Sequence, residues 1–95
     1  MRRAKIDANQ SDVVAALRKA GAVVYSLAAV GSGIPDLLIA FRGVTMLLEI
    51  KDGAKVKSKQ KLTKMQIEFF RTWAGGPLAT VDGPEAALRA IGVLK

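Results

Sequence analysis

Two acidic residues and a lysine stand at the ends of two apolar runs, and they are the residues of this sequence best suited to chemistry. Asp36 precedes the run 37–41. Glu49 lies near the end of the run 44–51, and Lys51 follows it by two residues. Residues i and i+2 of a strand share one face of the sheet. Glu49 and Lys51 are therefore expected to project together.

A hairpin about Arg42-Gly43 would bring the third group to the other two. If the two runs pair antiparallel around this turn, the start of the first lies opposite the end of the second. Asp36 would then lie beside Glu49. Charged groups inside an apolar sheet are costly unless they are paired or bind a metal ion. The stretch from Gly31 to Lys51 is therefore the candidate active site.

The chemistry that these groups allow is metal-assisted cleavage of a phosphodiester. Magnesium prefers oxygen ligands and keeps several waters beside one or two carboxylates, a role that suits Asp36 and Glu49. The carbonyl of Ile50 can supply another oxygen if the strand twists there. Such an ion polarises the phosphodiester and lowers the pKa of a bound water. Lys51 can orient that water or stabilise the added negative charge, and a role as general base is left open because it needs a strongly depressed pKa.

Composition excludes most other enzymatic routes. The 95 residues contain neither histidine nor cysteine, which excludes histidine-dependent triads, thiolate chemistry and most zinc sites. Fifteen basic residues against eight acidic ones give a net charge of +7, which favours a polyanionic partner. No apolar run reaches the roughly 20 residues that span a bilayer. We expect a single-domain cytoplasmic protein with no membrane partner.

Capping signals and apolar periodicity predict an α/β domain. Asp7 with Gln10, and Thr63 with Gln66, are spaced as capping boxes that begin helices, and Pro84 suits a first helical turn. The nearly continuous apolar runs 37–41 and 44–51 predict a central strand pair that is buried on both faces and covered by helices. Tyr25 and Trp73 are expected in the core rather than as platforms for base stacking. A basic tip over 1–6 and a mobile basic loop over 53–61 are also expected. The expected elements are a helix over about 7–21, strands over 22–27, 37–41, 44–51 and 78–81, a helix over 64–73, and a last helix that opens at 82–85 and closes at about 92.

One motif of this chain resembles a known family. Gly33-Ile34-Pro35-Asp36, followed after 12 residues by Glu49-Ile50-Lys51, is similar to the PD-(D/E)XK nuclease motif. The predicted α-β-β-β-α-β order with a C-terminal helix resembles the core of that superfamily, which is a central mixed sheet flanked by helices. Within it, the short chain and the later Leu62-Thr63-Lys64-Met65-Gln66 resemble the stand-alone VRR-NUC domains of phages and prophages. The resemblance covers about residues 7–92.

The resemblance implies a role for each matched residue. Asp36, Glu49 and the Ile50 carbonyl would bind Mg²⁺ or Mn²⁺, and Lys51 would serve catalysis. Gln66 matches a glutamine near the scissile phosphate, although its capping-box position alone also explains it. Many family members carry a glutamate on the first helix, where this chain has Gln10. One tightly held ion is therefore expected rather than two, and Gln10 can equally be structural.

The resemblance also implies a substrate and an assembly. Stand-alone members of this kind resemble Holliday junction resolvases and act as homodimers on branched DNA inside the bacterial host cell. A nicking or flap-type accessory nuclease of phage replication is the alternative within the same class, and a non-catalytic nucleic-acid-binding module, or an RNA-associated basic protein, is the alternative outside it. The residues expected to contact the DNA backbone are Ser32, Lys55, Lys57, Lys59, Lys61 and Lys64.

Overall fold

The chain follows the predicted order of helices and strands in a computed structural model, which describes residues 8–51 and 62–95. The expected basic tip over 1–6, the helix cap at Asp7 and the whole of the expected basic loop over 53–61 lie outside the described residues. Among those described, no helix has the length and apolar character needed to cross a membrane. The elements are α1 (Ala8–Lys19), β1 (Val23–Ser26), β2 (Leu37–Phe41), β3 (Val44–Ile50), α3 (Lys64–Thr72), β4 (Leu78–Val81) and α4 (Pro84–Ala90).

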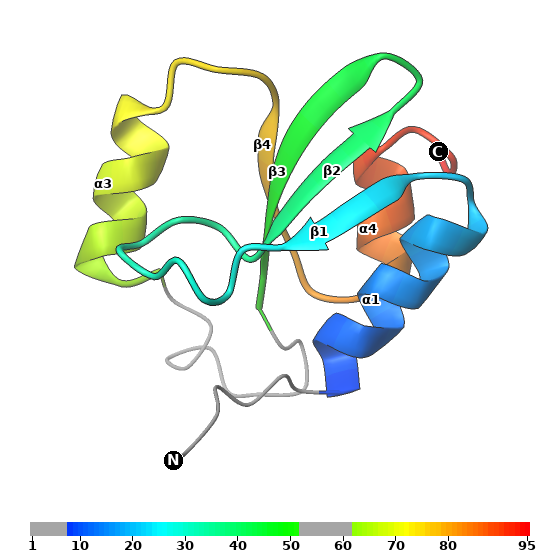
Figure 1. Ribbon diagram of the computed structural model, residues 1–95, viewed down its shortest axis with the longest axis horizontal. Coiled ribbons are helices and arrows are strands. Elements are labelled where there is room, and N and C mark those ends of the chain that lie inside the picture. Colours follow the sequence, from blue (N-terminus) through cyan, green and yellow to red (C-terminus); the bar gives the residue numbers. More distant parts are fainter. Residues whose placement is uncertain (1–7, 52–61) are drawn as a thin grey trace.

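The four described strands form one mixed sheet in the order β1-β2-β3-β4 (Figure 1). Strands β1, β2 and β3 pair antiparallel, whereas β4 runs parallel to β3. The predicted hairpin is present: Phe41 pairs with Val44, which leaves Arg42 and Gly43 as a two-residue turn with φ of 51° and 81°. Two successive positive φ values suit the right-handed twist of the flanking strands. The guanidinium of Arg42 lies 4.7 Å from the centre of the Phe41 ring.

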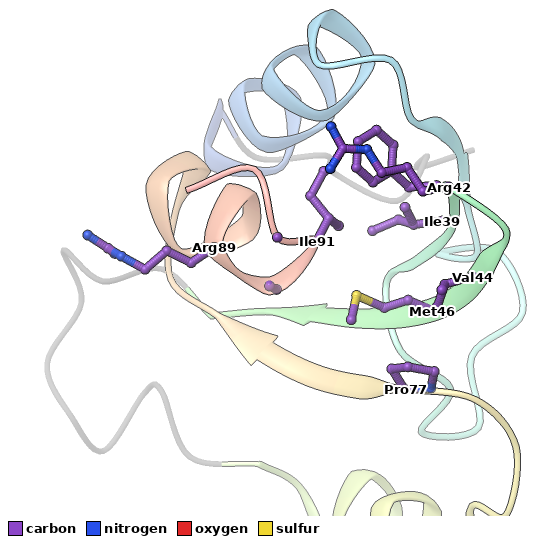
Figure 2. Close-up of a pocket in the computed structure, with 10 residues that line it drawn as sticks. Ile39, Arg42, Val44, Met46, Pro77, Arg89 and Ile91 are labelled. Carbon is purple, nitrogen blue, oxygen red and sulfur yellow. The ribbon is translucent and has the colours of Figure 1, made fainter. Parts of the chain in front are cut away.

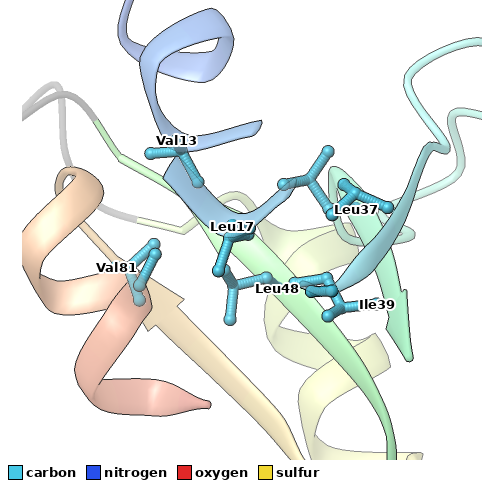
Figure 3. Packing of buried hydrophobic residues seen from close by; sticks show 9 residues of the cluster. Val13, Leu17, Leu37, Ile39, Leu48 and Val81 are labelled. Atoms are coloured by element: carbon cyan, nitrogen blue, oxygen red, sulfur yellow. The ribbon is translucent and has the colours of Figure 1, made fainter. Parts of the chain in front are cut away.

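The hydrophobic core lies on one face of this sheet, under α1 and α4 (Figures 1 and 3). Val13 and Leu17 recur at helical spacing on α1 and are fully buried. They pack with the alternate residues Leu37 and Ile39 of β2 and with Leu48 of β3. Val81 of β4 and Ala87 of α4 complete the same cluster.

The opposite face of the sheet is covered less than the sequence suggested. Helix α3 lies on this side (Figure 1), yet none of its residues is buried. On β1, Val23 and Tyr25 are 52% and 63% exposed, and Trp73 beyond the end of α3 is 41% exposed. The prediction that Tyr25 and Trp73 belong to the core is therefore wrong. On β3 the consecutive residues Leu47, Leu48 and Glu49 are all buried, which agrees with the predicted burial of the central strands on both faces at this point.

Candidate active site

The hairpin register places Asp36 beside Glu49, as the sequence predicts. Leu37 pairs with Leu48, so the next position along the same register sets Asp36 opposite Glu49. The Asp36 Oδ2 accepts a hydrogen bond of 2.7 Å from the backbone N–H of Ile50. This bond ties the loop before β2 to the end of β3, and it fixes the position of the Asp36 carboxylate.

Glu49 and Lys51 project from the same face of β3, and their side chains meet. The Lys51 Nζ lies 3.5 Å from the Glu49 Oε2. Both groups also contact Gln66 on the first turn of α3. The Gln66 Nε2 donates to Glu49 Oε2 at 2.8 Å, and the Lys51 Nζ donates to Gln66 Oε1 at 3.1 Å. Strand β3 and helix α3 are thus joined through three polar side chains.

The predicted capping box of α3 sets the orientation of the Gln66 amide. The Thr63 side chain accepts from the Gln66 backbone N–H at 3.2 Å, and the Thr63 N–H donates to Gln66 Oε1 at 2.8 Å. Because Oε1 accepts two bonds here, Nε2 is the atom directed at Glu49. Capping and contact with the site are therefore served by the same side chain of Gln66.

The environment of Glu49 disfavours its charged form. The residue is only 3% exposed, and within the described part of the chain its Oε1 is buried without a hydrogen-bond partner. Burial, with the nearby Asp36 carboxylate as the next cause, raises the pKa of Glu49 from 4.5 to about 7, although Lys51 opposes the change. A second positive charge near this carboxyl would stabilise its charged form and so offset the rise in its pKa.

The donors at this site fit a hard cation that keeps much of its own water. Two carboxylates lie close together, one of which has an unsatisfied buried oxygen. Within residues 8–51 and 62–95 no cluster of three or more histidine, cysteine, aspartate or glutamate side chains is present. Magnesium and manganese need only one or two carboxylates when waters and substrate supply the other ligands. That the Ile50 carbonyl also binds the metal ion stays a prediction.

Two other predicted residues lie together in a neighbouring groove. Ser32 and Lys64 line the same hollow between the loop before β2 and helix α3. Gln10 instead lines a hollow beside α1 and β1. The side chains of the candidate site do not line this hollow; they are Asp36, Glu49, Lys51 and Gln66. The predicted DNA contacts Lys55, Lys57, Lys59 and Lys61 lie outside the described residues.

Sequence reasoning missed the role of Gly33. Its φ is 79°, and a Cβ atom there would lie 2.5 Å from the backbone oxygen of Met65. The loop that carries Asp36 therefore lies directly on the first turn of α3, next to Gln66. A glycine with positive φ in a Gly-Ser-Gly turn is a recognisable signal of tight backbone geometry, but the sequence does not reveal what it packs against.

A separate apolar cavity of about 260 Å³ lies at the hairpin end of the sheet (Figure 2). The residues that line it include Ile39, Arg42, Met46 and Ile91. Asp36, Glu49, Lys51 and Gln66 are not among its lining residues. This cavity is therefore distinct from the polar cluster.

Comparison with known proteins adds no family assignment: no family model, no curated protein and no solved structure matches this chain.

Proposed function

We propose that this protein is a divalent-metal-dependent endonuclease that hydrolyses phosphodiester bonds in DNA. The observation that carries the proposal is the cluster at the end of β3. Asp36 and Glu49 lie side by side with a raised Glu49 pKa, and Lys51 is held against Glu49 by Gln66. A buried glutamate that has one unsatisfied oxygen and lies beside a second carboxylate is a poor stabilising device but a suitable cation site.

Each residue has a distinct part in the proposed reaction. Asp36 and Glu49 would hold a magnesium or manganese ion, which when bound polarises the phosphodiester and lowers the pKa of a water. The Lys51 ammonium is a donor for the negative charge that develops on the phosphoryl oxygens. The Gln66 amide limits the positions of Lys51 and Glu49, so that neither must be reorganised when DNA binds.

The family and the substrate belong to the same proposal. The mixed sheet, the order of elements and the converging Asp36, Glu49 and Lys51 support membership of the PD-(D/E)XK superfamily in its VRR-NUC form. We further propose branched DNA, with the four-way junction as the preferred substrate. Two symmetric cuts require two sites, whereas one chain supplies one cluster, so a two-fold symmetric homodimer is the simplest active assembly.

Cleavage of labelled DNA tests the proposal. Wild-type protein is incubated with a four-way junction, a flap, a splayed arm and a linear duplex, with Mg²⁺, Mn²⁺ or EDTA. Metal-dependent paired nicks in the junction are expected, and Asp36→Asn and Lys51→Met should each abolish them. Asp12→Asn on the exposed side of α1 is the matched control and should cleave normally.

Three results would count against parts of this function. Cleavage of the flap alone would replace the resolvase by an accessory nuclease. Tight DNA binding without cleavage in any metal would favour a non-catalytic module. Cleavage that survives both Asp36→Asn and Lys51→Met would show that the active site is elsewhere.

A further inference from the structure

A groove of about 380 Å³ lies beside the candidate active site, between the loop before β2 and helix α3. Lys64 and Met65 on its wall directly precede Gln66, so the groove and the polar cluster share the first turn of α3. The lining residues are Ser32, Lys64, Met65, Glu68, Phe69 and Thr72.

We propose that this groove receives an unpaired nucleotide of the DNA strand next to the cleavage site. Its base would stack on the Phe69 ring, and its phosphate would contact Lys64 and Ser32. The proposal rests on the proposed nuclease function, because it names the substrate feature that the same site would recognise. It also explains how one chain can distinguish branched DNA that carries unpaired bases, such as a flap or a splayed arm, from a continuous duplex.

The aromatic pair on α3 supports base stacking. Phe69 and Trp73 are stacked, with ring centres 5.2 Å apart and planes inclined by 18°. The Trp73 Nε1 donates to the Gly76 carbonyl at 2.8 Å, which fixes the indole behind Phe69. Within the described chain α3 has no buried residue: Phe69 is half-buried and Trp73 is exposed, so part of this aromatic pair is accessible at the surface. Every base has a π face, and stacking on an aromatic side chain therefore needs no particular sequence.

The charges around the groove suit a phosphate more than a second protein copy. The exposed Lys64 contributes an ammonium group, and Ser32 contributes a hydroxyl. Glu68 is the one carboxylate in the lining, and its charge is balanced by Arg71, which contacts both of its oxygens. The chain as a whole carries a net charge of +7, which attracts a polyanion.

Ser32 occupies its position at a conformational cost. Its φ is 58°, in the left-handed region, between two glycines that also have positive φ. Glycine would adopt this conformation without strain, so packing alone does not favour serine here. A hydroxyl placed at the mouth of the groove, where a phosphate oxygen would lie, accounts for serine at this position.

The single tryptophan provides the readout. Trp73 is the only tryptophan in the chain, and its emission is recorded while an oligothymidylate strand is titrated into the protein in EDTA, so that no cleavage occurs. Saturable quenching is expected.

Phe69→Leu should weaken binding roughly 5-fold or more, given that stacking contributes roughly 1–3 kcal/mol per base, whereas Phe69→Tyr should bind like the wild type. Ile67→Ala, an exposed apolar residue of α3 outside the groove, is the matched control and should bind normally.

A second pair of variants tests the same groove in case Phe69→Leu does not fold. Lys64→Gln and Ser32→Gly both leave the aromatic pair intact and should weaken binding. For Lys64→Gln, the dependence of log binding constant on log salt should become shallower by about 0.7, the value for one phosphate contact on a single strand. Circular dichroism confirms that each variant is folded.

The outcomes separate this proposal from the nuclease function. If the wild type cleaves no DNA but shows aromatic-dependent quenching, the groove proposal stands and the enzyme proposal fails. If the wild type cleaves junctions but Phe69→Leu binds oligothymidylate as tightly as the wild type, the groove proposal is overturned. Trp73 emission that changes with protein concentration and not with DNA would also overturn it, because the groove would then be a contact between copies.

Discussion

The Gln66 amide donates to Glu49 through Nε2 at 2.8 Å, and this one bond links the helix cap of α3 to the end of β3. Its Oε1 is already held by the Thr63 N–H, so the amide cannot easily turn over. The candidate site is therefore assembled by local helix chemistry on one side and by hairpin register on the other.

Replacing Gln66 should separate positioning from folding. Gln66→Ala removes the contacts to Glu49 and Lys51, and we expect the single-turnover cleavage rate to fall roughly 10- to 100-fold, as is usual when a supporting hydrogen bond is lost. DNA affinity should change little. Thr63→Ala weakens the same helix cap at a cost of roughly 1 kcal/mol but leaves the Gln66 side chain in place. Rates that fall equally in both variants would show that Gln66 acts only through the helix.

Glu49 should make stability depend on pH in the absence of metal. Its folded-state pKa of about 7 lies above the ordinary value of 4.5, so the folded protein binds this proton more tightly than the unfolded chain. The stabilisation from that proton is complete below pH 4.5 and is lost as pH rises to about 7. Glu49 contributes at most about 1.4 kcal/mol per pH unit to the pH dependence of the unfolding free energy.

Urea unfolding at several pH values measures this slope. Glu49→Gln should be less sensitive to pH across the same window. Mg²⁺ should stabilise the wild type above pH 7 and act weakly at pH 5, because the ion competes with the proton on Glu49. A variant with the same pH profile as the wild type would contradict the assigned pKa.

Two glycines of one loop form a matched pair for testing the contact with α3. Gly31 and Gly33 have φ of 71° and 79°, but a Cβ meets nothing within 4 Å at Gly31 and lies 2.5 Å from the Met65 carbonyl at Gly33. Gly31→Ala should cost roughly 1–2 kcal/mol from backbone strain alone. Gly33→Ala should lower the free energy of unfolding clearly more. It should also reduce cleavage, because the added methyl group would push the loop that carries Asp36 away from α3. Equal losses of unfolding free energy would contradict this role.

The hairpin and the helix caps could be predicted because their signals are local. Arg42-Gly43 between two apolar runs sets the register, and that register alone places Asp36 opposite Glu49. Thr63 and Gln66 are three residues apart, so their reciprocal bonds are visible in the sequence. These short-range constraints determine most of the candidate site.

The exposure of Tyr25 on β1 and of Trp73 could not be predicted, because its causes are tertiary. The apolar residues of α3 indicated a buried helix, but none of its residues is buried, and Trp73 stacks on Phe69. The contacts of α3 with the site include the Gln66 bond to Glu49 and the close approach of Gly33. The contact between Gly33 and Met65 joins backbone segments far apart in the chain. No local pattern specifies such a pair.

Manganese binding tests most directly whether Asp36 and Glu49 together hold a divalent cation. Titration calorimetry at pH 8 should give one Mn²⁺ per chain for the wild type and for Lys51→Met, and no measurable binding for Asp36→Asn or Glu49→Gln. Binding of the wild type should weaken at pH 5.5, where Glu49 is protonated. Mn²⁺ affinity that is absent in the wild type, or unchanged in both carboxylate variants, would contradict the proposed metal site.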